Sequence, residues 1–152
     1  MSINKEMLAK WGPTVLRLGV GVVFFAHGSQ KMWGWFGGPG LSGWLEFVDA
    51  MGFPKVLAVL AALTEFFGGL GLILGFLTRL SAFGIFCVMA VAILKVHLKD
   101  GFFMNWFLAQ DRGHGMEYSL TLLLAATSLM LSGSGRLGLD KLIWKRKTDS
   151  LI

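Results

Sequence analysis

The sequence predicts an all-α integral membrane protein: a four-helix bundle with an interfacial or re-entrant loop on its outer side. Two observations lead to this class. Hydrophobic residues make up 55% of the 152 residues and charged residues only 15%, with a mean hydropathy of +0.65. A soluble domain of this length cannot easily bury so much apolar surface. The apolar residues also gather in four stretches close to the length, about 20 residues, that crosses a bilayer as a helix.

The four predicted spans form one membrane domain over residues 1–152. They cover about residues 12–31, 55–77, 80–98 and 116–131. Between the second and third spans lie only two residues, Thr78 and Arg79. A connection this short makes those two helices antiparallel neighbours.

The basic residues predict that both termini lie in the cytoplasm. The termini and the turn at Arg79 together hold eight lysines and arginines, whereas the opposite side holds four. This asymmetry matches the excess of positive charge found in cytoplasmic loops. In the tail, residues 136–152, apolar and basic residues are interspersed, which is typical of an amphipathic segment that binds anionic lipid. Membrane lipids, rather than nucleic acid, are therefore the expected partners of this charge.

The loop over residues 28–53 is long and rich in aromatic residues. Its first part, WGWFGGPG at residues 33–40, predicts a turn with tryptophans suited to the headgroup layer. The apolar residues of its second part share one face of a helix: Leu41, Trp44, Leu45 and Val48. This pattern predicts a short interfacial helix or a re-entrant cap. Such a segment either anchors the loop in the headgroups or forms a lid over an outward-facing pocket.

A single carboxylate, Glu65, lies in the middle of the second span. A charge at that depth costs roughly 2.5–3.5 kcal/mol unless it is compensated, so we expect it to face protein or water rather than lipid. A helix rise of about 1.5 Å per residue places His27 and His97 at a similar depth, and Arg17 roughly 10 Å lower. We therefore expect Glu65 to be the floor of an outward-facing polar pocket rather than half of a simple salt bridge.

Six residues of the outer half are the candidates for ligand binding: His27, Lys31, Glu65, His97, Glu117 and Tyr118. His27 and Lys31 are four residues apart and share one helical face. Lys95 and His97 are two apart, about 200° around a helix, so both cannot point inward. We expect His97 to point inward and Lys95 to reach the headgroups. His114, in a loop, is expected to be solvated.

Three interpretations of these groups remain open. The first is structural: salt bridges and hydrogen bonds between helices that fix the bundle. The second is a polar pocket for an amphiphile such as a quinone, in which histidine and carboxylate bind the headgroup oxygens and move protons. The third is bis-histidine haem ligation by His27 and His97, which the adjacent charges disfavour. No spacing predicts a metal site, and a lone cysteine, Cys87, excludes an internal thiol–disulfide relay.

Several motifs in a fixed order resemble the DoxX family of small bacterial membrane proteins. The matching stretches are RLGVGVVFFAHGSQKMWGWFGGPG (17–40), TEFFGGLGLILGFLTR (64–79), VHLKDGFF (96–103), MEYSL (116–120) and GRLGLDKL (135–142). Each motif alone is weak, but their joint order is specific and covers nearly the whole chain.

The resemblance implies a four-helix bundle in the bacterial inner membrane. It also implies that the six candidates occupy positions that are typical of the family. Three further residues match such positions and are expected to have a structural or coupling role: Arg17, Thr78 and Arg79. Members of the family include a small subunit of a thiosulfate:quinone oxidoreductase. Others are linked to membrane oxidoreductase complexes involved in oxidative-stress defence.

The residues and the resemblance together predict a membrane subunit of a redox system that binds a quinone or a similar lipophilic molecule. The sequence contains no visible electron-carrying centre, so a redox partner subunit or the ligand would bring the electrons. The alternative is a non-enzymatic membrane adaptor or a small-molecule transport protein whose buried charges only hold helices together. For a chain of this length, transport would require a homo-oligomer.

Overall fold

The computed structural model describes residues 5–110 and 112–143. Every regular element in these residues is helical, which confirms the all-α prediction. Two helical segments, Lys55–Leu74 and Thr78–Asp100, are long and apolar enough to cross a membrane. A third apolar helix, Glu117–Ser132, is shorter.

The main helices follow the predicted spans, with one additional helix in the long aromatic loop. They are α1 (Lys5–Trp33), α2 (Gly40–Ala50), α3 (Lys55–Leu74), α4 (Thr78–Ala92) and α5 (Glu117–Ser132). A 3₁₀ turn, Trp35–Gly37, precedes α2. Beyond its last residue, α4 continues through a π-helical segment, Ile93–His97, into a 3₁₀ turn, Leu98–Asp100. The first helix begins at Lys5, earlier than the predicted start near residue 12, and the predicted loop helix is α2.

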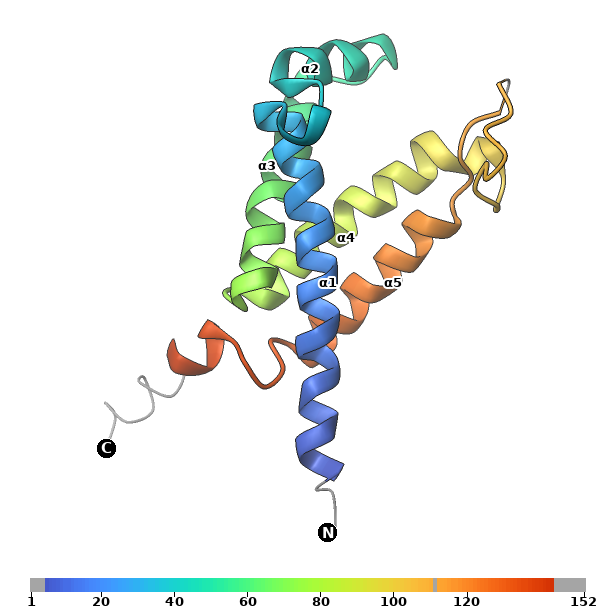
Figure 1. The fold of residues 1–152 in the computed structure, drawn as a ribbon. Helices are drawn as coiled ribbons and strands as arrows, with labels where there is room; N and C mark the ends of the chain where they lie inside the picture. Colours follow the sequence, from blue (N-terminus) through green and yellow to red (C-terminus); the bar gives the residue numbers. More distant parts are fainter. Residues whose placement is uncertain (1–4, 111, 144–152) are drawn as a thin grey trace.

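Two helix pairs converge at one end of the molecule and separate toward the other (Figure 1). One pair is α1 and α3, which run side by side, with α2 across their upper ends. The other pair is α4 and α5, which leans away from α1. We call the end that carries α2 the α2 end. The opposite end, where residues 133–143 lie, is the tail end.

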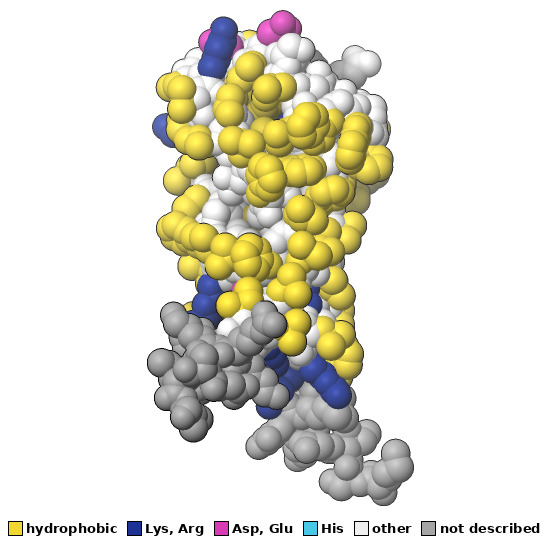
Figure 2. Space-filling model, turned by 90° about the vertical axis from the view of Figure 1, so that its left-hand side faces the viewer, with side chains coloured by type: hydrophobic (Ala, Val, Ile, Leu, Met, Phe, Trp, Pro, Cys, Tyr) yellow, Lys and Arg dark blue, Asp and Glu magenta, His cyan; other side chains and the backbone are white. Residues whose placement is uncertain are grey.

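The buried apolar core lies where the two pairs converge. It consists of Val20, Phe24, Leu72, Ala82, Ile85, Ala126 and Leu129. These residues come from α1, α3, α4 and α5, so a single core joins both pairs. Large apolar side chains also cover much of the exterior, as Figure 2 shows for one face, where the charged groups gather toward the two ends. An exterior of this kind suits a lipid environment better than water.

Glycines allow α1 and α3 to pack with their backbones in close contact. A side chain at Gly28 would collide with the backbone of Phe66, and one at Gly69 would collide with the backbone of Phe25. The sequence predicts a face of small residues around Glu65 that lets another helix approach, and α1 is that helix. This contact also fixes the register, because it sets Gly28 opposite Glu65 and Phe66.

At the tail end, a buried arginine closes the C-terminus of α3. Gly75 ends this helix in a left-handed conformation, with a φ of 65°. The Nη1 atom of Arg17 donates to the carbonyls of Leu72 and Ile73, both at 2.6 Å, and its Nε donates to the Ser134 carbonyl at 3.0 Å. The last carbonyls of a helix lack intrahelical N–H partners, and a cation there also interacts favourably with the helix dipole.

A carboxylate caps the start of α4 beside this arginine. Asp140 accepts hydrogen bonds from the backbone N–H groups of Leu77 at 2.6 Å and Thr78 at 3.0 Å. Its own N–H donates to the carbonyl of Gly75 at 2.9 Å. The tight α3–α4 turn is therefore held on one side by Arg17 and on the other by Asp140. Thr78, which is fully buried, belongs to this structure.

The remaining residue of predicted structural role, Arg79, also lies near the tail end. Its exposed side chain donates from Nη2 to the Leu131 carbonyl, close to the end of α5, at 3.3 Å. Of the predicted basic tail over residues 136–152, residues 139–143 are helical. Residues 144–152 lie outside the part of the chain that the structure describes.

Candidate functional site

A cavity of about 450 Å³ lies at the α2 end between the two helix pairs. Its apolar wall comes from every main helix and includes Val23, Phe24, Val48, Leu57, Met89 and Leu122. Small-molecule sites typically have volumes of about 300–1,000 Å³, mostly apolar walls and a few polar groups that orient the ligand. The cavity therefore has the size and lining of a small-molecule site.

The structure places most of the predicted ligand-binding residues on this cavity. Five of the six line it: His27, Lys31, Glu65, His97 and Tyr118. The sixth, Glu117, lies outside it. Its Oε1 accepts hydrogen bonds from the backbone N–H of Met104 and from Nε1 of Trp106, both at 3.1 Å. Glu117 therefore organises the loop that precedes α5.

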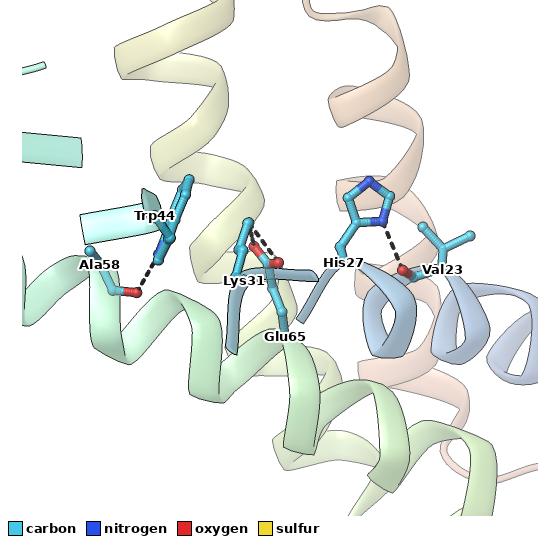
Figure 3. Close-up of polar contacts among 6 residues, drawn as sticks. All are labelled: Val23, His27, Lys31, Trp44, Ala58 and Glu65. Carbon is cyan, nitrogen blue, oxygen red and sulfur yellow. Dashed lines mark hydrogen bonds and ion pairs between the residues drawn. The ribbon is translucent and has the colours of Figure 1, made fainter. Parts of the chain in front are cut away.

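Glu65 of α3 is paired with Lys31 of α1. The Lys31 ammonium lies 2.5 Å from one carboxylate oxygen of Glu65 and 2.6 Å from the other (Figure 3). The Glu65 side chain is 2% exposed and that of Lys31 is 19% exposed. The expectation that Glu65 is not half of a salt bridge is wrong. The helix register explains the error, because the contact at Gly28 brings Lys31 within reach of a carboxylate that seemed too deep.

Trp44 of α2 contacts the charged side chain of this ion pair that α1 supplies, Lys31. Its ring centroid lies 4.3 Å from the Lys31 ammonium, and its Nε1 donates to the Ala58 carbonyl at 2.8 Å (Figure 3). A cation over an indole ring is stabilised by the ring quadrupole. Trp44 thus ties α2 to both α1 and α3, and it was predicted only as part of an apolar stripe.

The two predicted histidines are held by backbone carbonyls. Nδ1 of His27 lies 2.9 Å from the carbonyl oxygen of Val23, and Nδ1 of His97 lies 2.9 Å from that of His114. A carbonyl oxygen can only accept, so each Nδ1 carries the hydrogen. In the neutral ring, Nε2 is then an acceptor without a hydrogen. Figure 3 shows this second nitrogen of His27 pointing away from Val23.

His97 reaches the cavity from the π-helical segment Ile93–His97. Lys95, in the same segment, is exposed and does not line the cavity, which agrees with the predicted opposite directions of these two side chains. Single π-helical turns are frequent at functional sites. His114 is exposed, as the sequence predicted for a solvated loop residue, but it also lines the cavity, because the loop folds back so that its carbonyl meets His97.

The helix α2 forms the cover of the cavity that the sequence allowed as one of two interpretations. Three of its side chains line the space, Trp44, Phe47 and Val48, and so does Met51 directly after its last residue. Val48 is 5% exposed, so this part of the cover is packed rather than loosely placed. Among the residues that the structure describes, no group of three or more His, Cys, Asp or Glu side chains is arranged to hold a metal ion.

Comparisons with known proteins agree with the order of motifs. The chain is 31% identical over 141 residues to the Bacillus subtilis protein named "Putative oxidoreductase CatD", with 93% of each chain covered. It is 33% identical over 147 residues to the Mycobacterium tuberculosis protein named "Uncharacterized membrane protein Rv3486", covering 92% of this chain and 87% of the relative.

A third relative is the Escherichia coli protein named "Inner membrane protein YqjF", which is 26% identical over 137 residues, covering 89% of this chain and 94% of the relative. No solved structure matches the chain. The DoxX family pattern matches residues 12–98, which include most of α1, the whole of α2, α3 and α4, and the segment that carries His97. The chain belongs to the DoxX family.

Proposed function

We propose that this chain is a membrane subunit of a redox system, and that its cavity binds a quinone or a similar lipophilic small molecule. The observation that carries the proposal is the cavity itself. A mainly apolar space of about 450 Å³ receives His27, Glu65 and His97 from three separate segments of the chain. Polar groups that converge in one apolar pocket are the usual mark of a ligand site.

The proposed placement is a four-span bundle in the bacterial inner membrane. Helix α1 has 29 residues and is about 44 Å long at a rise of 1.5 Å per residue, which is enough to cross a bilayer. The other spans would be α3, α4 with its extension, and α5. Basic residues near the tail end, with Arg136 and Lys141 among them, favour a cytoplasmic position for that end. The α2 end then faces outward.

The groups around the cavity have the chemistry that a quinone requires. Reduction of a quinone adds protons to its two ring oxygens, and imidazole donates or accepts protons near neutral pH. His27 and His97 supply such groups beside the buried carboxylate of Glu65. The electrons would come from a partner subunit of the complex. The relative named as an oxidoreductase supports a role of this kind.

The second candidate is a non-enzymatic adaptor or small-molecule transporter, and the ion pair favours it. Lys31 contacts both oxygens of Glu65 and the ring of Trp44, so its charge is well compensated without any ligand. An ion pair that is satisfied in this way needs no ligand, and a purely structural role, holding the helices together, is enough to explain it. A transporter built from this chain would require more than one copy.

Thermal unfolding of the purified protein in detergent, with and without decylubiquinone, tests the proposal. A ligand present at about 100 times its Kd stabilises the folded state by about 2.7 kcal/mol, which raises the melting temperature. We expect Glu65→Gln and His97→Ala each to reduce this ligand-dependent rise. Glu46→Gln is the matched control, because Glu46 is exposed on α2 and does not line the cavity.

The two candidates differ in the outcome. If the ligand leaves the melting temperature of the wild type unchanged and both variants behave like it, the quinone proposal is wrong. An adaptor predicts that Glu65→Gln lowers the melting temperature by itself while decylubiquinone has no effect on any variant. A transporter is distinguished by a detergent-corrected mass of two or more chains.

A further inference from the structure

The hydrogen-bonding capacity that remains free in the cavity consists mostly of acceptors. Lys31 is the strongest donor there, and its ammonium group contacts both Glu65 oxygens and the Trp44 ring. An ammonium group has three N–H donors and no acceptor, so two of its donors are already committed to the carboxylate and its remaining side faces an aromatic ring. Little donor capacity of Lys31 is left for a ligand.

The histidines offer the opposite capacity. Nδ1 of His27 is committed to the Val23 carbonyl and Nδ1 of His97 to the His114 carbonyl, each at 2.9 Å. In the neutral ring, each Nε2 therefore carries a lone pair and no hydrogen, so it can accept a hydrogen bond. Both histidines line the same cavity. Two residues that each keep a free acceptor nitrogen, from different segments of the chain, thus line one ligand space.

Three further polar side chains on the wall, those of His114, Tyr118 and Ser119, can each both donate and accept, so they favour neither form of the ligand. The Tyr118 hydroxyl can donate or accept, and its side chain is 43% exposed at the edge of the cavity. The Glu65 carboxylate is 2% exposed and can only accept in its ionised form. A ligand that brings its own hydroxyl donors can satisfy these acceptors, whereas a dione has only acceptors to offer.

We propose that the cavity binds the reduced, dihydroxy-aromatic form of its ligand in preference to the oxidised dione. This inference rests on the proposed function and specifies which redox form the site holds. One ring hydroxyl donates to Nε2 of His27 and the other to Nε2 of His97, and the apolar wall covers the ring. The site would therefore act as the place where the subunit takes up or retains the reduced ligand.

Binding of tetramethylhydroquinone and tetramethyl-1,4-benzoquinone to the full chain in detergent tests this preference. Both rings are fully substituted, which prevents addition of the quinone to the exposed thiol of Cys87. The assay is run at pH 8 and without oxygen, so that the hydroquinone is not oxidised during the measurement. Quenching of tryptophan fluorescence reports binding, because Trp44 lines the cavity. We expect the hydroquinone to bind about tenfold more tightly, the effect of two ordinary hydrogen bonds.

Two controls isolate the hydroxyl donors. The dimethyl ether of the hydroquinone has the same ring without any O–H group, and we expect it to lose the preference. His27→Leu and His97→Leu each remove one Nε2 acceptor, and each should reduce the preference by about threefold, with Glu46→Gln as an unaffected control. A double variant that folds and keeps the full preference would overturn the inference.

The tautomers themselves can be observed without any variant. In the wild-type chain labelled with ¹⁵N at histidine, long-range ¹H–¹⁵N spectra should show the hydrogen on Nδ1 for the two histidines that face the cavity. Hydrogens on Nε2 would contradict the premise. If both redox forms bind equally, or the dione binds more tightly, the preference is wrong while the proposed ligand class stands. If neither form binds, the proposed function fails with it.

Discussion

The tail end and the α2 end both bury charged groups between helices, but they use them differently. At the tail end, Arg17 donates to three backbone carbonyls and Asp140 accepts from two backbone N–H groups. At the α2 end, Lys31 and Glu65 satisfy one another, while His27 and His97 each keep a ring nitrogen free of backbone contacts. Buried groups whose capacity the backbone fills fix the fold, whereas groups with spare capacity beside a cavity are available to a ligand.

Packing follows the same division. A Cβ atom at Gly75 would lie 2.6 Å from the Cα of Gly138 and 3.0 Å from the Cζ of Arg17, so the tail end has no spare space at this turn. At the α2 end the helix pairs separate around a cavity of about 450 Å³. The tail end is therefore tightly packed, whereas the α2 end encloses a cavity. We expect substitutions at the tail end to lower mainly the free energy of unfolding, and substitutions at the α2 end to change ligand binding as well.

The largest effect is expected from Arg17→Leu at the tail end. This side chain is 3% exposed, and its loss leaves the carbonyls of Leu72, Ile73 and Ser134 without their donor. Breaking one side of a buried charged network costs about 3–5 kcal/mol. Unfolding in mixtures of mild detergent and dodecyl sulfate, followed by circular dichroism, measures the change.

Arg79→Leu is the matched control for this substitution. Arg79 is exposed and makes one hydrogen bond, at 3.3 Å, to the Leu131 carbonyl. We expect its loss to change the free energy of unfolding by less than about 1 kcal/mol. If both variants lowered the free energy of unfolding equally, the carbonyl contacts of Arg17 would not stabilise the turn between α3 and α4.

A smaller loss is expected from Glu65→Gln at the α2 end. The substitution leaves the Lys31 ammonium without its counter-ion, at a cost of about 2–3 kcal/mol. Adding Lys31→Met to Glu65→Gln removes the stranded charge and should recover most of this loss. Asp49→Asn is the control, because its ion pair with Lys55 at 3.5 Å is exposed, and its loss should cost less than about 1 kcal/mol. If the loss of stability in the double variant equalled the sum of the losses in the two single variants, Glu65 and Lys31 would not be energetically coupled.

Much of the fold could be predicted from the sequence, because apolar runs and turn residues are local signals. The helices α3 and α5 begin or end within a few residues of the predicted spans. The hydrogen bonds of Asp140 could not be predicted, because its N–H partners at the start of α4 lie more than 60 residues away in the chain. Likewise, the depth of Glu65 relative to Lys31 depends on helix register, which the contact between Gly28 and Phe66 sets.

The candidate site was predicted in most of its residues but not in its contacts. Five of the six residues line the cavity, and the signal that identified them was a charged or polar residue in or beside an apolar span, where lipid contact is costly. Glu117 and Tyr118 were both predicted to bind the ligand, but they are adjacent and therefore about 100° apart around a helix, and only Tyr118 lines the cavity. The position of His114 had no local signal, because a loop brings it back over the π-helical segment that carries His97.

Glycine substitutions test whether α1 must contact α3 through its backbone. Gly28→Ala places a Cβ against the backbone of Phe66, and such overpacking typically costs about 1–3 kcal/mol. Gly19→Ala is the control in the same helix, because a Cβ there would meet nothing within 4 Å. The control should be neutral or stabilising by up to about 1 kcal/mol, through helix propensity. Thermal unfolding in detergent measures both, and equal behaviour would contradict the close contact.

The smallest change in the free energy of unfolding is expected from Trp44→Phe. This substitution weakens the packing of α2 over the cavity and leaves the contacts at the tail end unchanged. The substitution removes the hydrogen bond from Nε1 to the Ala58 carbonyl and weakens the contact with Lys31, which together cost about 1 kcal/mol. Trp35→Phe is the control, since Trp35 is 52% exposed and does not line the cavity. If α2 is the cover, Trp44→Phe should also speed ligand release, measured as the loss of bound radiolabelled ligand after rapid dilution because the variant lacks the fluorescent reporter. An unchanged release rate with the same loss of stability would make α2 a structural anchor instead.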